Sequence, residues 1–131
     1  MIALDLALAL RDAGLRWTPR RGDRFVLPHR GMDEEIFVLS DMTIEVHQFP
    51  AGPVIGFNGT TEWALDSIAQ SEALWVPAEH QLRERLGDAF AGLAPTGDGY
   101  RVTLRIDGAT IGFEGPDAAE AYAKALLSLL R

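Results

Sequence analysis

Apolar residues recur along the chain with two spacings, one typical of helices and one typical of strands. The segment before Gly14 fits both. Its leucines alternate like those of a strand, whereas its Ala and Leu content and the glycine at its end favour a helix. We predict a helix, whose apolar stripe consists of Leu6, Ala9, Leu10 and Ala13. Capping residues, prolines and apolar stripes predict three more helices, over residues 60–68, 77–87 and 115–130.

Strand patterns occupy most of the remaining chain. Between residues 17 and 57, short β-branched or aromatic runs are separated by Pro, Gly and Asp, which is typical of an antiparallel sheet. These runs are "RFVL", "EIFVL", "MTIEVHQ" and "PVIGF". Farther on, "AFAGL", "YRVTLRI" and "ATIGFE" predict three consecutive strands, with a tight turn at Asp107 and Gly108. The middle strand has an apolar face, Tyr100, Val102, Leu104 and Ile106, and an opposite face, Arg101, Thr103 and Arg105.

The order of these elements predicts an α+β fold, with antiparallel strands in the N-terminal half followed by an α-β-β-β-α C-terminal half. No proline-rich, serine-rich or highly charged linker separates the two halves. We therefore predict a single domain over residues 1–131, with sub-layers at roughly 1–76 and 77–131.

The composition is that of a globular protein that folds without covalent cross-links. With 131 residues, 47% of them hydrophobic and 24% charged, the chain can bury a core of its own. It has no cysteine, which excludes disulfides and thiolate chemistry and is compatible with a reducing cytoplasm. The first residues lack the features of a signal peptide, and no apolar run reaches the roughly 18 residues of a membrane span. We expect a cytoplasmic monomer or homodimer without membrane contact.

The net charge of −7 is unevenly distributed. Residues 1–30 carry six Arg and three Asp, whereas residues 31–131 carry six basic and sixteen acidic side chains. The excess of acid repels phosphate, so we expect no nucleic-acid partner. Double-stranded RNA-binding domains share the α-β-β-β-α order, but the last helix here begins with the acidic "GPDAAEA". One segment is basic in this mainly acidic chain. It contains Arg16, Arg20, Arg21 and Arg24, which we interpret as a solvated edge rather than an anion site.

None of the catalytic motifs that we compared with the sequence is complete. In "GFNGTTEWALDSI", Gly56 and Glu62 match the start of a Nudix signature, but Gln70 and Ser71 occupy the positions of its Arg-Glu pair. The single lysine, Lys124, does not belong to a P-loop, and no serine lies in a Gly-x-Ser-x-Gly elbow. The three histidines have no metal-ligand spacing. We therefore predict neither a cofactor nor a metal site.

The strongest candidate surface is a polar stretch around a tryptophan, together with one strand face. Its members are Asn58, Thr60, Thr61, Glu62, Trp63, Asp66, Glu45 and His47. The leading hypothesis is an accessory or binding module, without catalysis, that engages a protein or a small molecule there. The alternative is a small hydrolase that uses Glu45, His47, Glu62 and Asp66 in one cleft, with or without a metal ion.

Four segments carry a resemblance: "GDRFVLP", "EEIFVLSDMTIEVH", "VIGFNGTTEWALDS" and "ALWVPAEHQLRERLG". Together they resemble a family of small uncharacterised proteins from actinobacteria, the high-GC Gram-positive bacteria, which often carry the label pilus assembly protein. The resemblance covers nearly the full length. More distantly, "WVPAEHQLRERLGDAF" and "GPDAAEAYAKALLSLL" are similar to small phage-associated proteins of unknown role. The resemblance implies an intact domain and supplies no catalytic residue.

Overall fold

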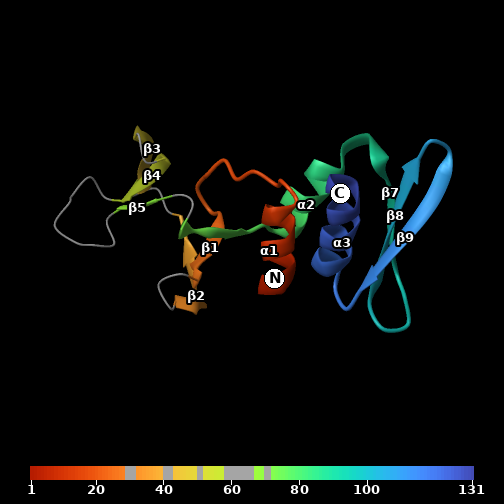
Figure 1. The fold of residues 1–131 in the computed structure, drawn as a ribbon. Helices are drawn as coiled ribbons and strands as arrows, with labels where there is room; N and C mark the ends of the chain where they lie inside the picture. Colours follow the sequence, from red (N-terminus) through yellow and green to blue (C-terminus); the bar gives the residue numbers. More distant parts are fainter. Residues whose placement is uncertain (29–31, 40–42, 50–51, 58–66, 70–71) are drawn as a thin grey trace. The chain divides into compact units, whose positions relative to one another are not determined.

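The computed structural model describes residues 1–28, 32–39, 43–49, 52–57, 67–69 and 72–131 (Figure 1). Its helices and antiparallel sheets form an α+β fold, as the sequence predicts. The chain divides into two compact units: unit 1 comprises Met1–Arg16 and Pro77–Arg131, and unit 2 comprises Trp17–Val76. The sub-layers predicted from the sequence put the first helix with the strands that follow it, whereas in the structure this helix belongs with the C-terminal residues.

Unit 1 is a three-stranded antiparallel sheet with helices on one side (Figure 1). Its elements are α1 (Leu4–Asp12), α2 (Glu79–Leu86), the 3₁₀ helix η3 (Gly87–Ala89), β7 (Phe90–Pro95), β8 (Tyr100–Ile106), β9 (Ala109–Gly115) and α3 (Ala118–Leu130). Helix α3 packs on β8 and β9, and both α1 and α2 contact α3. Buried apolar side chains of this unit include Leu10, Leu82, Val102, Leu104, Tyr122 and Leu126.

The contact between α1 and α3 explains why the first helix belongs to unit 1. The backbone N–H of Ala3 donates to Oε1 of Glu120, at 2.7 Å, and Ile2, Ala7 and Leu10 are buried. The predicted stripe is correct at Leu10 but wrong in detail, because Ala7 is buried and the other three members are half-buried. A helix that packs mainly against one neighbour, as α1 does against α3, buries a narrow face, and the apolar residues beside that face stay partly exposed.

Local sequence signals begin and end the helices. Asp117 caps α3, since its Oδ1 accepts from the backbone N–H of Glu120 at 2.8 Å. After α1, Gly14 has a φ of +110°, and the backbone N–H of Leu15 donates to the carbonyl of Leu10 at 2.9 Å. This is the expected glycine-terminated helix end. Helix α2 ends at Gly87, with Leu82 and Leu86 buried as predicted.

A two-residue turn joins β8 to β9. Asp107 and Gly108 have φ angles of 52° and 80°, and positive φ at both central residues defines the type I′ turn that matches strand twist. The paired residues run without a shift from Ile106 opposite Ala109 to Tyr100 opposite Gly115. Strand β7 is less regular, because its register with β8 shifts between Phe90 and Gly92.

Unit 2 contains two antiparallel sheets, ordered β2-β1-β6 and β3-β4-β5 among the described residues. Its strands are β1 (Arg24–Leu27), β2 (Met32–Val38), β3 (Thr43–Phe49), β4 (Gly52–Phe57), β5 (Ser67–Ala69) and β6 (Leu74–Val76). The first sheet is built around aromatic rings. Trp17 lies 5.6 Å from Phe25 and 6.4 Å from Trp75, and Phe25 lies 5.5 Å from Phe37, all between ring centroids.

The predicted helix over 60–68 is wrong where it can be compared with the structure. Ser67–Ala69 is the strand β5, in which Ile68 lies opposite Ile55 of β4. Pairing with β4 satisfies the backbone groups of this segment in the extended conformation, which outweighs weak local helix propensity. Residues 60–66 lie outside the described part of the chain.

Candidate functional site

The residues predicted to form a binding surface fall mainly outside the described structure. Asn58, Thr60, Thr61, Glu62, Trp63 and Asp66 all lie within residues 58–66. Glu45 and His47 belong to β3, where their backbones pair with those of Gly56 and Val54. The structure does not test whether the eight side chains meet, so this surface and its hydrolase alternative stay predictions.

Within the described residues, one exposed surface with several polar side chains is the side of the β7-β8-β9 sheet that faces away from α3, which we call the open face. Residues that pair directly across an antiparallel sheet share a side, and the sides alternate along each strand. The open face therefore comprises Gly92, Ala94, Arg101, Thr103, Arg105, Thr110, Gly112 and Glu114. Six of these residues are exposed and two half-buried, and the helices of unit 1 lie on the other side (Figure 1).

A shallow groove of about 390 Å³ crosses the open face, lined by Arg101, Thr103, Thr110, Gly112 and Glu114. Nη2 of Arg101 donates to Oε1 of Glu114 at 2.9 Å, which links β8 to β9. Both side chains are more than half exposed, so the ion pair contributes little to stability but orients the guanidinium. Gly112 makes room for it, because a Cβ there would lie 3.1 Å from Cδ of Arg101.

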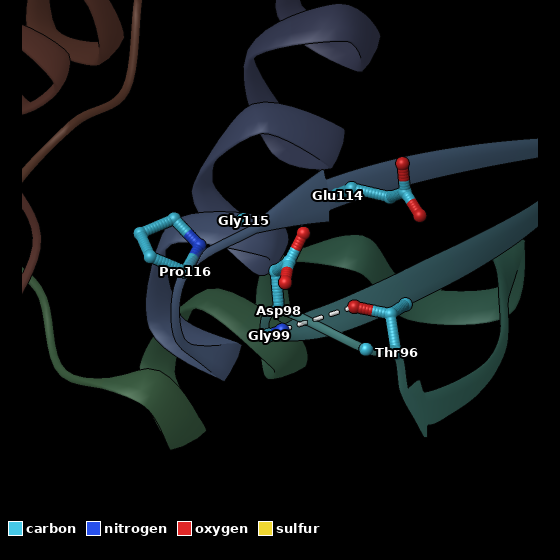
Figure 2. Close-up of a pocket in the computed structure, with 7 residues that line it drawn as sticks. Thr96, Asp98, Gly99, Glu114, Gly115 and Pro116 are labelled. Atoms are coloured by element: carbon cyan, nitrogen blue, oxygen red, sulfur yellow. Dashed lines mark hydrogen bonds between the residues drawn. The ribbon is translucent and has the colours of Figure 1, made fainter.

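A second hollow, of about 400 Å³, lies between the β7–β8 loop and the end of β9 with the following Pro116 (Figure 2). Oγ1 of Thr96 accepts from the backbone N–H of Gly99 at 3.0 Å, and the backbone N–H of Thr96 donates to the carbonyl of Gly99 at 2.8 Å. Figure 2 shows that the carboxylates of Asp98 and Glu114 do not point toward each other. No described residues gather three His, Cys, Asp or Glu side chains into a metal-binding group. The hollow therefore lacks convergent ligands.

The basic segment of the sequence contains a structural turn that the sequence pattern did not predict. Asp23 is only 4% exposed, and its Oδ2 accepts from Nε1 of Trp17 at 2.8 Å and from the backbone N–H of Arg20 at 3.0 Å. Its carbonyl also accepts from the backbone N–H of Leu39, at 2.9 Å. The sequence feature that could have predicted this turn is the Gly-Asp dipeptide at positions 22 and 23, because Asp side chains accept hydrogen bonds from backbone N–H groups in turns. Around this anchor, Arg16, Arg20 and Arg21 are exposed and Arg24 is half-buried.

Burial shifts one titratable group of unit 1. Tyr122 on α3 is 3% exposed, and its ring lies 5.7 Å from that of Phe90. Burial raises the pKa of Tyr122 above its ordinary value of 10.0, the nearby Arg83 lowers it, and Glu79 raises it by a smaller amount. This tyrosine lies on the helix side of the sheet and belongs to the core of unit 1, not to the open face.

Comparison with known proteins adds no assignment. No protein-family model, curated protein or solved structure matches the chain. The resemblance to the actinobacterial family therefore stays a prediction. Among the described residues, no helix combines the length and the apolar character that crossing a membrane requires.

Proposed function

We propose that this protein is a small accessory module that binds a protein partner through the open face of the β7-β8-β9 sheet and performs no catalysis. One observation carries the proposal: the open face presents arginine and threonine side chains from two adjacent strands on an exposed and regular surface. Arginine is enriched in protein interfaces because its planar guanidinium forms several hydrogen bonds at once. A twisted sheet holds these groups at fixed spacings.

The shape of the groove favours a protein over a small molecule as the partner. Its volume of about 390 Å³ falls within the range of ligand pockets. Ligand pockets, however, are enclosed and mainly apolar, whereas Arg101, Thr103, Thr110 and Glu114 line this groove with polar groups. A flat polar surface is typical of interfaces that trap water and exchange hydrogen bonds.

The local charge of the open face favours a partner that presents carboxylates to it. Two arginines and one glutamate give the open face a local charge of +1, on a chain whose net charge is −7. Glu114 pairs with Arg101, which leaves Arg105 as the cation best placed for a carboxylate of the partner. At physiological salt, charges more than about 8 Å apart are screened, so this local contact outweighs the repulsion from the rest of the surface. Binding should weaken as salt is added.

A pull-down with four immobilised forms of the full chain tests the proposal. Arg105→Glu reverses the charge on the open face, and Arg131→Glu makes the same change at an exposed position after α3. The double variant Glu62→Ala with Trp63→Ala removes the centre of the surface predicted from sequence. We expect Arg105→Glu alone to lose a partner that the wild type retains, with affinity reduced at least about tenfold, or about 1.4 kcal/mol.

Two outcomes contradict the open-face proposal. Loss of the partner in the Glu62 and Trp63 variant, with normal binding by Arg105→Glu, would assign binding to residues 58–66 instead. Identical partner profiles for all four folded proteins would exclude both surfaces. Circular dichroism of each variant confirms that folding is intact before the profiles are compared.

A further inference from the structure

Strand β9 forms one outer edge of the sheet in unit 1. It is seven residues long, from Ala109 to Gly115, and the sheet order β7-β8-β9 places no described strand beyond it. Five of its seven residues are exposed, and Ile111 is 42% exposed. An exposed, regular edge of this length is a template for pairing with another strand.

The turn before β9 determines which backbone groups the edge offers. In a two-residue hairpin, the pair that closes the turn, here Ile106 and Ala109, exchanges both hydrogen bonds. Bonded and non-bonded pairs then alternate along the ladder, and the register with β8 shows no shift. It follows that Thr110, Gly112 and Glu114 direct their N–H and C=O groups away from β8, toward the outer edge. The carbonyl of Glu114 already accepts from Nζ of Lys124 on α3 at 3.0 Å, so its second lone pair is the one that remains for another strand.

The two edges of the sheet differ in their protection. Natural edge strands avoid unwanted pairing through prolines, bulges, lysines or short length. The opposite edge, β7, contains Pro95 and a register shift between Phe90 and Gly92. Strand β9 itself contains no proline, no lysine and no register shift, and one of its carbonyls, that of Glu114, is covered by Lys124 of α3. Of the two edges of this sheet, β9 is therefore the more open to pairing.

We propose that β9 pairs antiparallel with β9 of a second copy of this chain, around a two-fold axis at Gly112, so that the two sheets form one sheet of six strands. In this register Gly112 faces Gly112 of the second copy, and Thr110 faces Glu114 of the second copy. Each of the three outward-directed residues then belongs to a pair that exchanges two hydrogen bonds. An isologous contact of this kind is the commonest form of dimer.

Side-chain chemistry favours this register over its neighbours. On the open face, Glu114 of the second copy lies opposite Thr110, whose partner on β8 is Arg105. An axis at Glu114 would instead place two like charges opposite each other, which is destabilising. On the helix side, the partly exposed Ile111 faces Phe113 of the second copy, which extends an apolar row across the junction. The edge is therefore complementary to itself in hydrogen bonds, charge and apolar contact.

The strength of this dimer and that of the open-face interaction should depend on salt in opposite ways. Each chain has a net charge of −7, so two copies repel each other, and added salt screens that repulsion. Dimerisation should strengthen with salt, whereas binding of an acidic partner to Arg105 should weaken. Thr110, Gly112 and Glu114 belong to both the open face and the edge of β9, so the opposite salt dependences distinguish the two proposals.

Sedimentation equilibrium on the full chain tests the dimer. We expect the wild type to associate in a concentration-dependent manner. Thr110→Pro removes one outward N–H without disturbing the bonds to β8, and Ile111→Lys places a charge in the apolar row. Both should raise the dissociation constant at least tenfold, whereas Thr110→Ala, which keeps the N–H, should not. A wild type that stays monomeric at every concentration, or a dimer that neither variant weakens, overturns the proposal.

A single engineered thiol provides a second measurement. Because the chain has no cysteine, Gly112→Cys introduces a unique thiol at the proposed axis, where Cα atoms of a bonded pair lie about 5.5 Å apart and a disulfide fits. The new Cβ lies 3.1 Å from Cδ of Arg101, a contact that a small shift of this flexible, exposed side chain relieves. Mild oxidation should link two copies of this variant rapidly. Ala94→Cys, which is exposed on β7, should link no faster than random collision allows. Equal rates for the two variants would contradict pairing at β9, even if Thr110→Pro failed to fold.

Discussion

At the scale of single residues, Gly99 shows how a missing side chain determines a loop. A Cβ at this position would overlap the carbonyl of Gly115 and lie 2.9 Å from Cα of Pro116, whereas a Cβ at Gly97 would meet nothing within 4 Å. We expect Gly99→Ala to lower the free energy of unfolding by about 1–3 kcal/mol, because backbone must shift to relieve the overlap. Gly97→Ala is the matched control and should change it by less than about 0.5 kcal/mol. Urea denaturation measures both, and equal effects would show that the loop does not pack against Pro116.

A second residue-scale prediction concerns alkaline pH. Burial raises the pKa of Tyr122 above 10.0, so the folded protein holds this proton more tightly than the unfolded chain does. The corresponding contribution to stability is complete below the unfolded pKa and is lost as the pH rises through the folded pKa. The free energy of unfolding should therefore fall above about pH 10. In Tyr122→Phe the fall should be smaller, and an identical fall in both proteins would mean that other groups cause it.

At the scale of elements, the sequence predicted those structures whose signals are local. The glycine after α1 and the tight turn at Asp107 and Gly108 both lie within four residues of the backbone groups that they satisfy. The start of α3 was predicted three residues too early, at Gly115, which is the last residue of β9. The same patterns did not predict β6 as a strand. Its partner is β1, in which Arg24 lies opposite Val76, and such distant pairing depends on the packing of the whole sheet. Strand β5 was missed for the same reason.

The hydrogen bond that caps α3 should contribute measurably to the stability of the protein. Oδ1 of Asp117 accepts from the backbone N–H of Glu120 at 2.8 Å, which satisfies a donor that the helix cannot. Asp117→Ala should lower the free energy of unfolding by about 1 kcal/mol, and Asp117→Asn, which keeps an acceptor, by only a few tenths. Thermal denaturation of the three proteins provides the comparison. A loss as large for Asn as for Ala would indicate that charge, rather than the hydrogen bond, stabilises this helix end.

At the scale of the whole molecule, the candidate site was only partly predictable. Alternation in "YRVTLRI" placed Arg101, Thr103 and Arg105 on one side of β8, and the structure confirms that Val102 and Leu104 are buried on the other. The neighbours of these residues on β9 could not be predicted as a surface, because that required the register of the hairpin. The predicted surface around Trp63 lies outside the described residues, so its position relative to Glu45 and His47 stays a prediction.

The last prediction follows from the distribution of charge over the molecule. The α-β-β-β-α order of residues 77–131 is that of double-stranded RNA-binding domains, which place basic residues at the start of their last helix. Here that position holds Asp117 and Glu120, whose carboxylates already accept hydrogen bonds from the backbone N–H groups of Glu120 and Ala3. A phosphate would meet two negative charges and occupied donors. Fold order alone therefore does not support RNA binding.

We accordingly expect no appreciable binding to duplex RNA or DNA at physiological salt. A gel-shift titration at low salt is the sensitive test, because phosphate contacts strengthen as salt is removed. The control is a variant with alanine at Arg16, Arg20, Arg21 and Arg24, three of which are exposed. Weak shifts at low salt that vanish at physiological salt agree with a protein of net charge −7. Tight binding that persists at physiological salt and is abolished in the arginine variant would instead show that this basic segment holds nucleic acid despite the repulsion.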